Sequence, residues 1–165
     1  MRIRSEPTPM PSAHSRTYRV AVGVDGSERG WAALDWAREA ADRPGATLTI
    51  CSARPARGAV QPIADIASME LFDPVLARHV HAVRDRLGGH RVDVELPIGD
   101  PATALLDLAH RSDLLVLGGS AQVPRGFHST VVTRVAARTT APLVVVRGLP
   151  AHPDSRLFAG HVVVG

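Results

Sequence analysis

Two short segments that combine glycine and serine are the residues best suited to bind an anionic ligand. Asp25–Ser27 reads Asp-Gly-Ser and follows the apolar run Val20–Val24. Gly118–Ser120 reads Gly-Gly-Ser and follows the apolar run Leu114–Leu117. Glycines let backbone N–H groups approach phosphate oxygens, and a serine hydroxyl or a helix N-terminus also binds negative charge. Asp25 has two interpretations, a ligand contact or a cap on the turn that follows its strand.

Catalytic and metal-binding patterns find little support. His79 and His81 are two residues apart, which places their rings on different faces of a helix and predicts no metal pair. Cys51 lies in an apolar segment and is interpreted as a small buried hydrophobic side chain. No serine stands in a Gly-x-Ser-x-Gly pattern, and a chain without lysine contains no phosphate loop that ends in Gly-Lys-Ser or Gly-Lys-Thr. We therefore expect a binding or regulatory module and not an enzyme.

The composition is that of one ordinary globular domain. The chain has 165 residues, 45% hydrophobic and 21% charged, so it can bury a sizeable core without disulfide bonds. A single cysteine excludes an intramolecular disulfide and is typical of a reducing cytoplasm. No apolar run approaches the ~20 residues of a membrane span. The proline-rich start predicts neither a signal peptide nor an anchor.

The basic residues have an unusual type but no unusual distribution. The formal net charge is +3, and all 19 basic residues are arginine. A GC-rich genome is the simplest explanation, since lysine and asparagine, both absent, have AT-rich codons. A nucleic-acid surface is the functional alternative. The arginines are spread along the chain without a dense run, and aromatic residues for base stacking are few, so we expect no nucleic-acid partner.

From Tyr18 on, short apolar runs alternate with segments whose apolar residues have helical spacing. The strands and helices that these patterns predict must position the two glycine-containing segments. Asp73 and Asp100 each precede a proline, the pattern of an N-cap followed by the first helical residue. The expected order is strand 18–24, helix 28–42, strand 46–53, helix 74–87, strand 91–96, helix 101–109, strand 114–118, helix 131–136 and strand 143–147. This alternation predicts an α/β fold with a parallel sheet and helices on both faces. Ligands bind such sheets beyond the carboxyl ends of the strands, where the strand order reverses.

Five segments, taken in order, resemble the universal stress protein family. They are Val22–Ser27 (VGVDGS), Ala32–Ala37 (AALDWA), Gly99–Leu106 (GDPATALL), Asp113–Gly118 (DLLVLG) and Ala141–Arg147 (APLVVVR). The resemblance implies a five-stranded parallel sheet in the order 3-2-1-4-5, of the adenine-nucleotide alpha-hydrolase-like type, and a homodimer joined through the last strand. Some members of the family bind ATP between the ends of strands one and four, and others lack that site.

The loop after the fourth strand departs from the nucleotide-binding members in three ways. Those members have a loop of Gly, two residues, Gly, nine residues, Gly and then Ser or Thr. Gly118 matches the first glycine, but Ala121 replaces the second and Ser129 the third. Residues 122–128 form a spacer that is two residues short. Each lost glycine costs about 1 kcal/mol where its position needs a positive φ, and the shorter loop changes which N–H groups point inward.

The resemblance implies an intact adenosine half of the site and an altered phosphate half. Asp25 stands where the family's carboxylate faces adenosine, and Ala53 where a backbone contact to adenine is expected. Arg125 is expected to replace lost phosphate donors. The implied binding residues are Val24, Asp25, Ala53, Leu117, Gly118, Gly119, Ala121, Arg125, Ser129, Thr130 and Val131.

Some of these residues also have a purely structural explanation, without a bound nucleotide. Ser129 and Thr130 are also explained as N-caps of the last helix, and Gly118–Gly119 by close packing at a strand end. We expect weakened binding of ATP, with Mg²⁺. The alternative is a nucleotide-independent dimeric interaction module whose loop 119–128 contacts a protein partner.

The two ends of the chain differ from the domain between them. The sequence predicts a disordered arm over residues 1–17 and the universal stress protein domain over residues 18–147. Residues 148–165 are predicted to be a linker with the start of a possible second repeat. Gly160–Gly165 (GHVVVG) is similar to Arg19–Gly23 (RVAVG), which is either the beginning of that repeat or a chance match. An unpaired strand at Val162–Val164 can also add to a sheet edge.

Overall fold

The computed structural model describes residues 16–54, 56, 66–119, 131–147 and 162–164. Within them, the elements are β1 (Tyr18–Gly23), α1 (Glu28–Ala41), β2 (Ala46–Cys51), α2 (Ile66–Phe72), α3 (Pro74–Leu87), a short 3-10 turn (Gly89–Arg91), β3 (Val92–Glu95), α4 (Pro101–Ala109), β4 (Leu114–Gly118), α5 (Val131–Ala136), β5 (Leu143–Val146) and β6 (Val162–Val164). None of the described helices has the length and apolar character needed to cross a membrane.

Five parallel strands form the sheet in the predicted order, β3-β2-β1-β4-β5. β1 lies at the centre because its residues Val20–Val22 are apolar without interruption and are buried on both faces. The register pairs Gly23 with Cys51 on β2 and with Leu117 on β4. The ends of these three strands, and the loops that follow them, therefore meet at one edge of the sheet.

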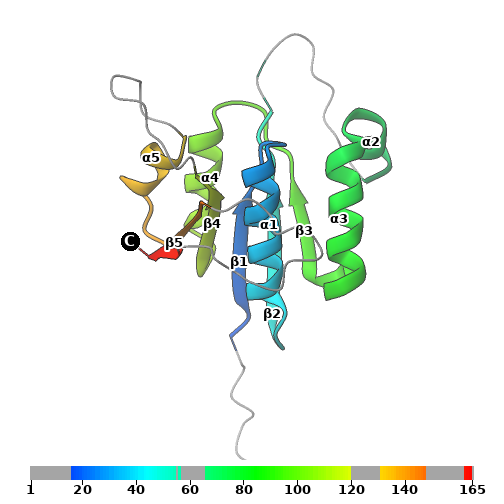
Figure 1. The fold of residues 1–165 in the computed structure, drawn as a ribbon, viewed down its shortest axis with the longest axis horizontal. Coiled ribbons are helices and arrows are strands. Elements are labelled where there is room, and N and C mark those ends of the chain that lie inside the picture. The colour runs from blue at the N-terminus through cyan, green and yellow to red at the C-terminus, as the bar shows by residue number, and fades with distance from the viewer. Residues whose placement is uncertain (1–15, 55, 57–65, 120–130, 148–161, 165) are drawn as a thin grey trace, which may run out of the picture.

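Helices cover both faces of this sheet (Figure 1). Val20 and Val22 point into a cluster with α1, α2 and α3 that includes Leu34. Ala21 points the opposite way, into a cluster with α4 and α5 that includes Leu105. The period of two along β1 thus divides the core into two apolar layers, as a doubly covered parallel sheet requires.

Side-chain caps set the starts of α3 and α4 at the residues that the sequence predicted. Asp73 accepts a hydrogen bond from the backbone N–H of Leu76 at 2.9 Å, and Asp100 accepts one from the N–H of Thr103 at 3.0 Å. Each cap is followed by proline, which lacks an N–H at a position where none is needed. α4 begins beside the edge where β1 and β4 end, so its cap helps position the candidate site.

A sixth strand lies outside β5 and was not predicted there. Val162–Val164 runs antiparallel to Val144–Val146 and adds to the sheet within the same chain. The sequence predicted that this segment could join a sheet edge, without indicating which one. The expected disordered arm and the linker stay predictions, since residues 1–15 and 148–161 lie outside the described part.

Candidate functional site

A cavity of about 660 Å³ opens where β1, β2, β4 and β5 end. The chain leaves β1 for α1 on one face of the sheet and leaves β4 toward α5 on the other. Crossovers in opposite directions leave a crevice between the two strands, which is where open α/β sheets bind ligands. The predicted site residues that the structure describes all line this cavity; they are Val24, Asp25, Ala53, Leu117, Gly118, Gly119 and Val131. Ala121, Arg125, Ser129 and Thr130 lie outside the described residues.

Asp25 lies on the exposed rim and organises the turn before α1. Its Oδ1 accepts hydrogen bonds from the N–H of Ser27 at 3.0 Å and from the Ser27 hydroxyl at 2.6 Å. The same hydroxyl accepts the N–H of Gly30 at 3.1 Å and so caps α1. Oδ2 of Asp25 has no partner among the described residues, so one oxygen holds the turn while the other can accept a ligand hydroxyl.

Gly118 and Gly119 form a wall that has no room for side chains. A Cβ on Gly118 would lie 2.5 Å from the carbonyl oxygen of Arg29, and one on Gly119 would collide with Cγ1 of Val145. The N–H of Gly119 donates to the carbonyl of Val146 at 2.9 Å. This N–H is therefore engaged by β5, and close packing accounts for both glycines.

Cys51 contributes an uncharged part of the lining. The residue is 2% exposed, and burial raises the pKa of its thiol to about 11, with the Glu95 carboxylate acting in the same direction. The thiol therefore stays protonated at neutral pH. Ala53 continues this surface beyond β2, so these two described residues give the β2 end of the cavity an uncharged lining.

Arg29 and Arg147 also line the cavity, and the sequence analysis did not single them out. Both are exposed. A signal for each was present in the sequence, because Arg29 is two residues beyond the cap Ser27 and Arg147 directly follows the last predicted strand. Their approach to one cavity depends on the strand order and could not be read from either segment alone.

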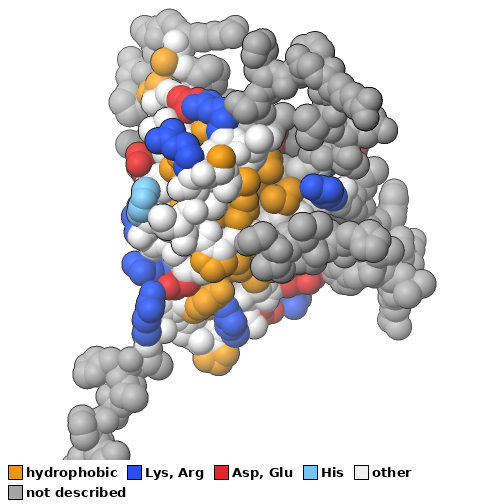
Figure 2. All heavy atoms as spheres, turned by 90° about the vertical axis from the view of Figure 1, so that its left-hand side faces the viewer, with side chains coloured by type: hydrophobic (Ala, Val, Ile, Leu, Met, Phe, Trp, Pro, Cys, Tyr) orange, Lys and Arg blue, Asp and Glu red, His pale blue; other side chains and the backbone are white. Residues whose placement is uncertain are grey.

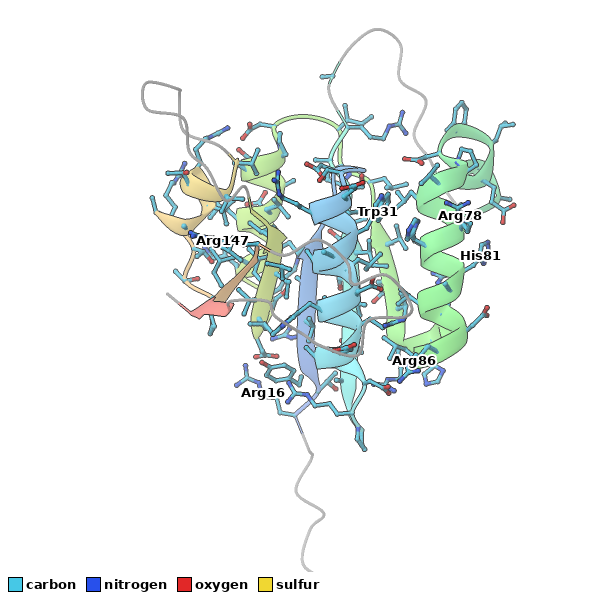
Figure 3. All side chains as sticks on the ribbon, in the orientation of Figure 1. Arg16, Trp31, Arg78, His81, Arg86 and Arg147 are labelled. Carbon is cyan, nitrogen blue, oxygen red and sulfur yellow. The ribbon has the colours of Figure 1, made fainter. Side chains whose placement is uncertain are left out.

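The two histidines of α3, His79 and His81, contact different residues. His79 stacks on Trp31 of α1 with ring centroids 3.9 Å apart, whereas His81 lies 2.6 Å from a carboxylate oxygen of Glu70. The two rings therefore lie on different faces of α3, as their spacing predicted, and Figure 3 shows His81 on the side of α3 away from Trp31. Across the described residues, no group of three or more metal-ligating side chains comes together.

The parallel sheet and its opposed crossovers define a doubly wound α/β protein, with the cavity at the reversal of strand order, where such folds bind ligands. Residues 17–147 match the Universal stress protein family. Because this match covers most of the chain, the protein belongs to the universal stress protein family, as the five sequence segments indicated.

Solved universal stress proteins share this fold. The protein UspA from Lactobacillus plantarum is 23% identical, with a TM-score of 0.59 over 81% of this chain and 99% of that one. A universal stress protein in complex with cAMP is 25% identical, with a TM-score of 0.61 over 79% of this chain and 97% of that one. A universal stress protein from Archaeoglobus fulgidus in complex with dAMP is 19% identical, with a TM-score of 0.56 over 78% and 96%. No curated protein matches the chain significantly.

Proposed function

We propose that this chain is a stress-response module that binds an adenine nucleotide, with weakened affinity for ATP, in the cavity between β1 and β4. The observation that carries the proposal is the placement of Asp25 and Gly118–Gly119 on one cavity at the reversal of strand order. Oδ2 of Asp25, which has no partner among the described residues, suits the hydroxyls of a ribose, and the uncharged surface at Cys51 and Ala53 suits a base. The universal stress protein solved with cAMP, at 25% identity, supports this assignment.

We also propose that the module is not an enzyme. Asp25 is the one carboxylate among the described lining residues, and its Oδ1 is engaged by Ser27. A hydrolase needs a base that can orient water, and in this proposal the remaining carboxylate oxygen, Oδ2 of Asp25, is occupied by the ribose. Mg²⁺ would enter with the phosphates of ATP, because a single carboxylate does not form a divalent-cation site alone.

A nucleotide-independent interaction module is the second candidate. The altered loop favours it, because Ala121 and Ser129 stand where nucleotide-binding members have glycine. The N–H of Gly119 also favours this candidate, because it is bonded to Val146 and is not available to a phosphate. In this case the loop 119–128 would contact a protein partner.

Released nucleotide distinguishes the two candidates. The purified protein is denatured, and adenine nucleotide in the supernatant is quantified by chromatography against protein concentration. Nucleotide near one equivalent, or binding of added ATP and Mg²⁺ by calorimetry, supports the nucleotide module. The absence of both overturns it in favour of the interaction module.

We further propose a homodimer joined along β5 and a cytoplasmic location. β6 covers the outer edge of β5 within the same chain, so pairing between copies along β5 requires β6 to leave that edge. The alternative use of residues 148–165, as the start of a second repeat, also takes β6 away from β5.

A further inference from the structure

Two arginines of the cavity have no carboxylate partner in the described part of the chain. They are Arg29 and Arg147, both exposed and both lining the cavity. Arg134, on the neighbouring helix α5, shows the contrast. It forms a two-pronged ion pair with Asp100, with both N–O distances 2.8 Å. With the single carboxylate of Asp25, Arg29 and Arg147 give the described lining of the cavity a net charge of +1, which favours an anionic ligand.

Arg147 lies beside Gly119, whose backbone N–H is already bonded within the sheet. It directly follows β5, and a Cβ placed on Gly119 would lie 3.8 Å from Cγ of Arg147. The N–H of Gly119 is bonded to Val146 and is not free for a ligand. The five donors of a guanidinium in this position replace what the backbone lacks. Figure 3 shows Arg147 near β5 and α5, and Figure 2, which views this side of the molecule, shows arginine side chains above and below an apolar strip.

Arg29 reaches the same wall from the other face of the sheet. It belongs to the first turn of α1, and its carbonyl oxygen packs against Gly118. The positive end of the α1 dipole lies at this turn and adds to the charge of the guanidinium. Gly118 and Gly119 therefore lie between two cationic residues that come from different elements.

The cavity is polarised along its length. Ala53 follows β2 and Arg147 follows β5, and three strand spacings, about 14 Å, separate those strands. Among the described residues, the β2 end is lined by the protonated thiol of Cys51 and by Ala53, whereas the β5 end carries the guanidinium of Arg147. Such a cavity fits an elongated ligand that is uncharged at one end and polyanionic at the other.

We propose that Arg29 and Arg147 bind the phosphates of the nucleotide and take over the role of the loop glycines that this chain lacks. The inference rests on the proposed function and assigns the phosphate contacts to two side chains, one in α1 and one directly after β5. Guanidinium groups bind phosphate oxygens through paired, charge-assisted hydrogen bonds. Affinity therefore rises from adenosine to AMP, ADP and ATP, and the gain decreases with salt.

Calorimetry with adenosine, ADP and ATP tests the inference on the full chain. The variants are Arg29→Ala, Arg147→Ala and Arg147→Lys, with Arg78→Ala as the matched control, because Arg78 is an exposed arginine on α3 outside the cavity. We expect each cavity variant to weaken ATP about ten- to a hundredfold, the loss of a hydrogen bond to a charged group. Adenosine affinity stays constant, Arg147→Lys recovers part of the loss, and Arg78→Ala changes neither ligand.

The outcomes separate the inference from the function on which it rests. If the unaltered protein binds ATP and both alanine variants bind it equally well, the arginine assignment is overturned while nucleotide binding stands. Equal affinity of the unaltered protein for adenosine and ATP overturns it in the same way. If the unaltered protein binds neither ligand, the proposed function fails first. Circular dichroism melting curves exclude unfolding as the cause of any loss, since both side chains are exposed.

Discussion

Asp25 uses its two carboxylate oxygens for different purposes. Oδ1 holds the backbone and hydroxyl of Ser27, which in turn caps α1 through Gly30. Oδ2 has no partner among the described residues, and Asp25 lines the cavity. The two interpretations of this residue, turn cap and ligand contact, are therefore compatible, and they differ in which oxygen they require.

Replacing Asp25 with alanine separates the two purposes. We expect Asp25→Ala to weaken ATP and adenosine alike by at least about tenfold, equivalent to about 1.4 kcal/mol. The free energy of unfolding changes by less than about 1 kcal/mol, because Ser27 still caps α1. Calorimetry and urea unfolding measure the two effects, with Asp35→Ala as the control, an exposed carboxylate on the same helix. Unchanged affinity in Asp25→Ala removes this residue from the site.

Cys51 offers a chemical probe of the cavity floor. Its pKa rises from 9.0 to about 11 in the folded protein because the thiol is buried. Thiolate is the reactive form, so we expect native protein at pH 8 to react with iodoacetamide about a hundredfold more slowly than urea-unfolded protein. Mass spectrometry measures the labelling, and the chain has no other cysteine. Equal rates in the two states contradict the buried position.

The same shift has a stability consequence with a defined sign. The folded state holds the thiol proton more tightly than the unfolded state. The contribution of Cys51 to stability is therefore complete below pH 9 and is lost as pH rises from 9 toward 11. A Cys51→Ala variant should show a smaller loss of stability over this pH interval.

At the scale of elements, the end of β4 and the start of α1 are joined by one close contact. A Cβ on Gly118 would lie 2.5 Å from the carbonyl oxygen of Arg29 and 2.9 Å from the backbone N of Gly30. Backbone atoms cannot move aside as the end of a flexible side chain can. A larger residue at this position must therefore push α1 away from the sheet or distort β4.

Gly118→Ala tests how much this contact contributes. We expect the variant to lose about 1–3 kcal/mol of unfolding free energy, the usual cost of overpacking, and to bind nucleotide more weakly because Arg29 shifts. Gly89→Ala is the matched control, since a Cβ there meets nothing within 4 Å. Urea unfolding gives the comparison. Equal stability of the two variants would show that α1 and β4 are not tightly coupled.

Local signals in the sequence predicted the helices and strands better than the arrangement of these elements in space. The cap-and-proline pairs at Asp73 and Asp100 placed two helix starts, because a cap acts within three residues of itself. The strand order came from the resemblance to a family. Arg29 and Arg147 were missed because their proximity arises from crossovers that bring residues 29 and 147 to one edge. β6 was missed as part of this sheet, since three valines do not specify which edge they pair with.

At the scale of the whole molecule, the outer edge of β5 has two possible partners. In this structure β6 occupies it, with Val145 opposite Val163. A second copy joined through the last strand would need the same edge. Both arrangements satisfy the N–H and C=O groups that an edge strand otherwise exposes, so they exclude each other along β5.

Competition for this edge predicts that weakening β6 favours self-association. Proline removes a backbone N–H and is poorly tolerated in paired strands, so we expect Val163→Pro to release β6 and to raise the dimer fraction at a given concentration. Light scattering after size-exclusion chromatography, over a concentration series of the full chain, measures the mass of both proteins. If Val163→Pro and the unaltered chain have the same mass throughout, β6 does not compete with self-association along β5.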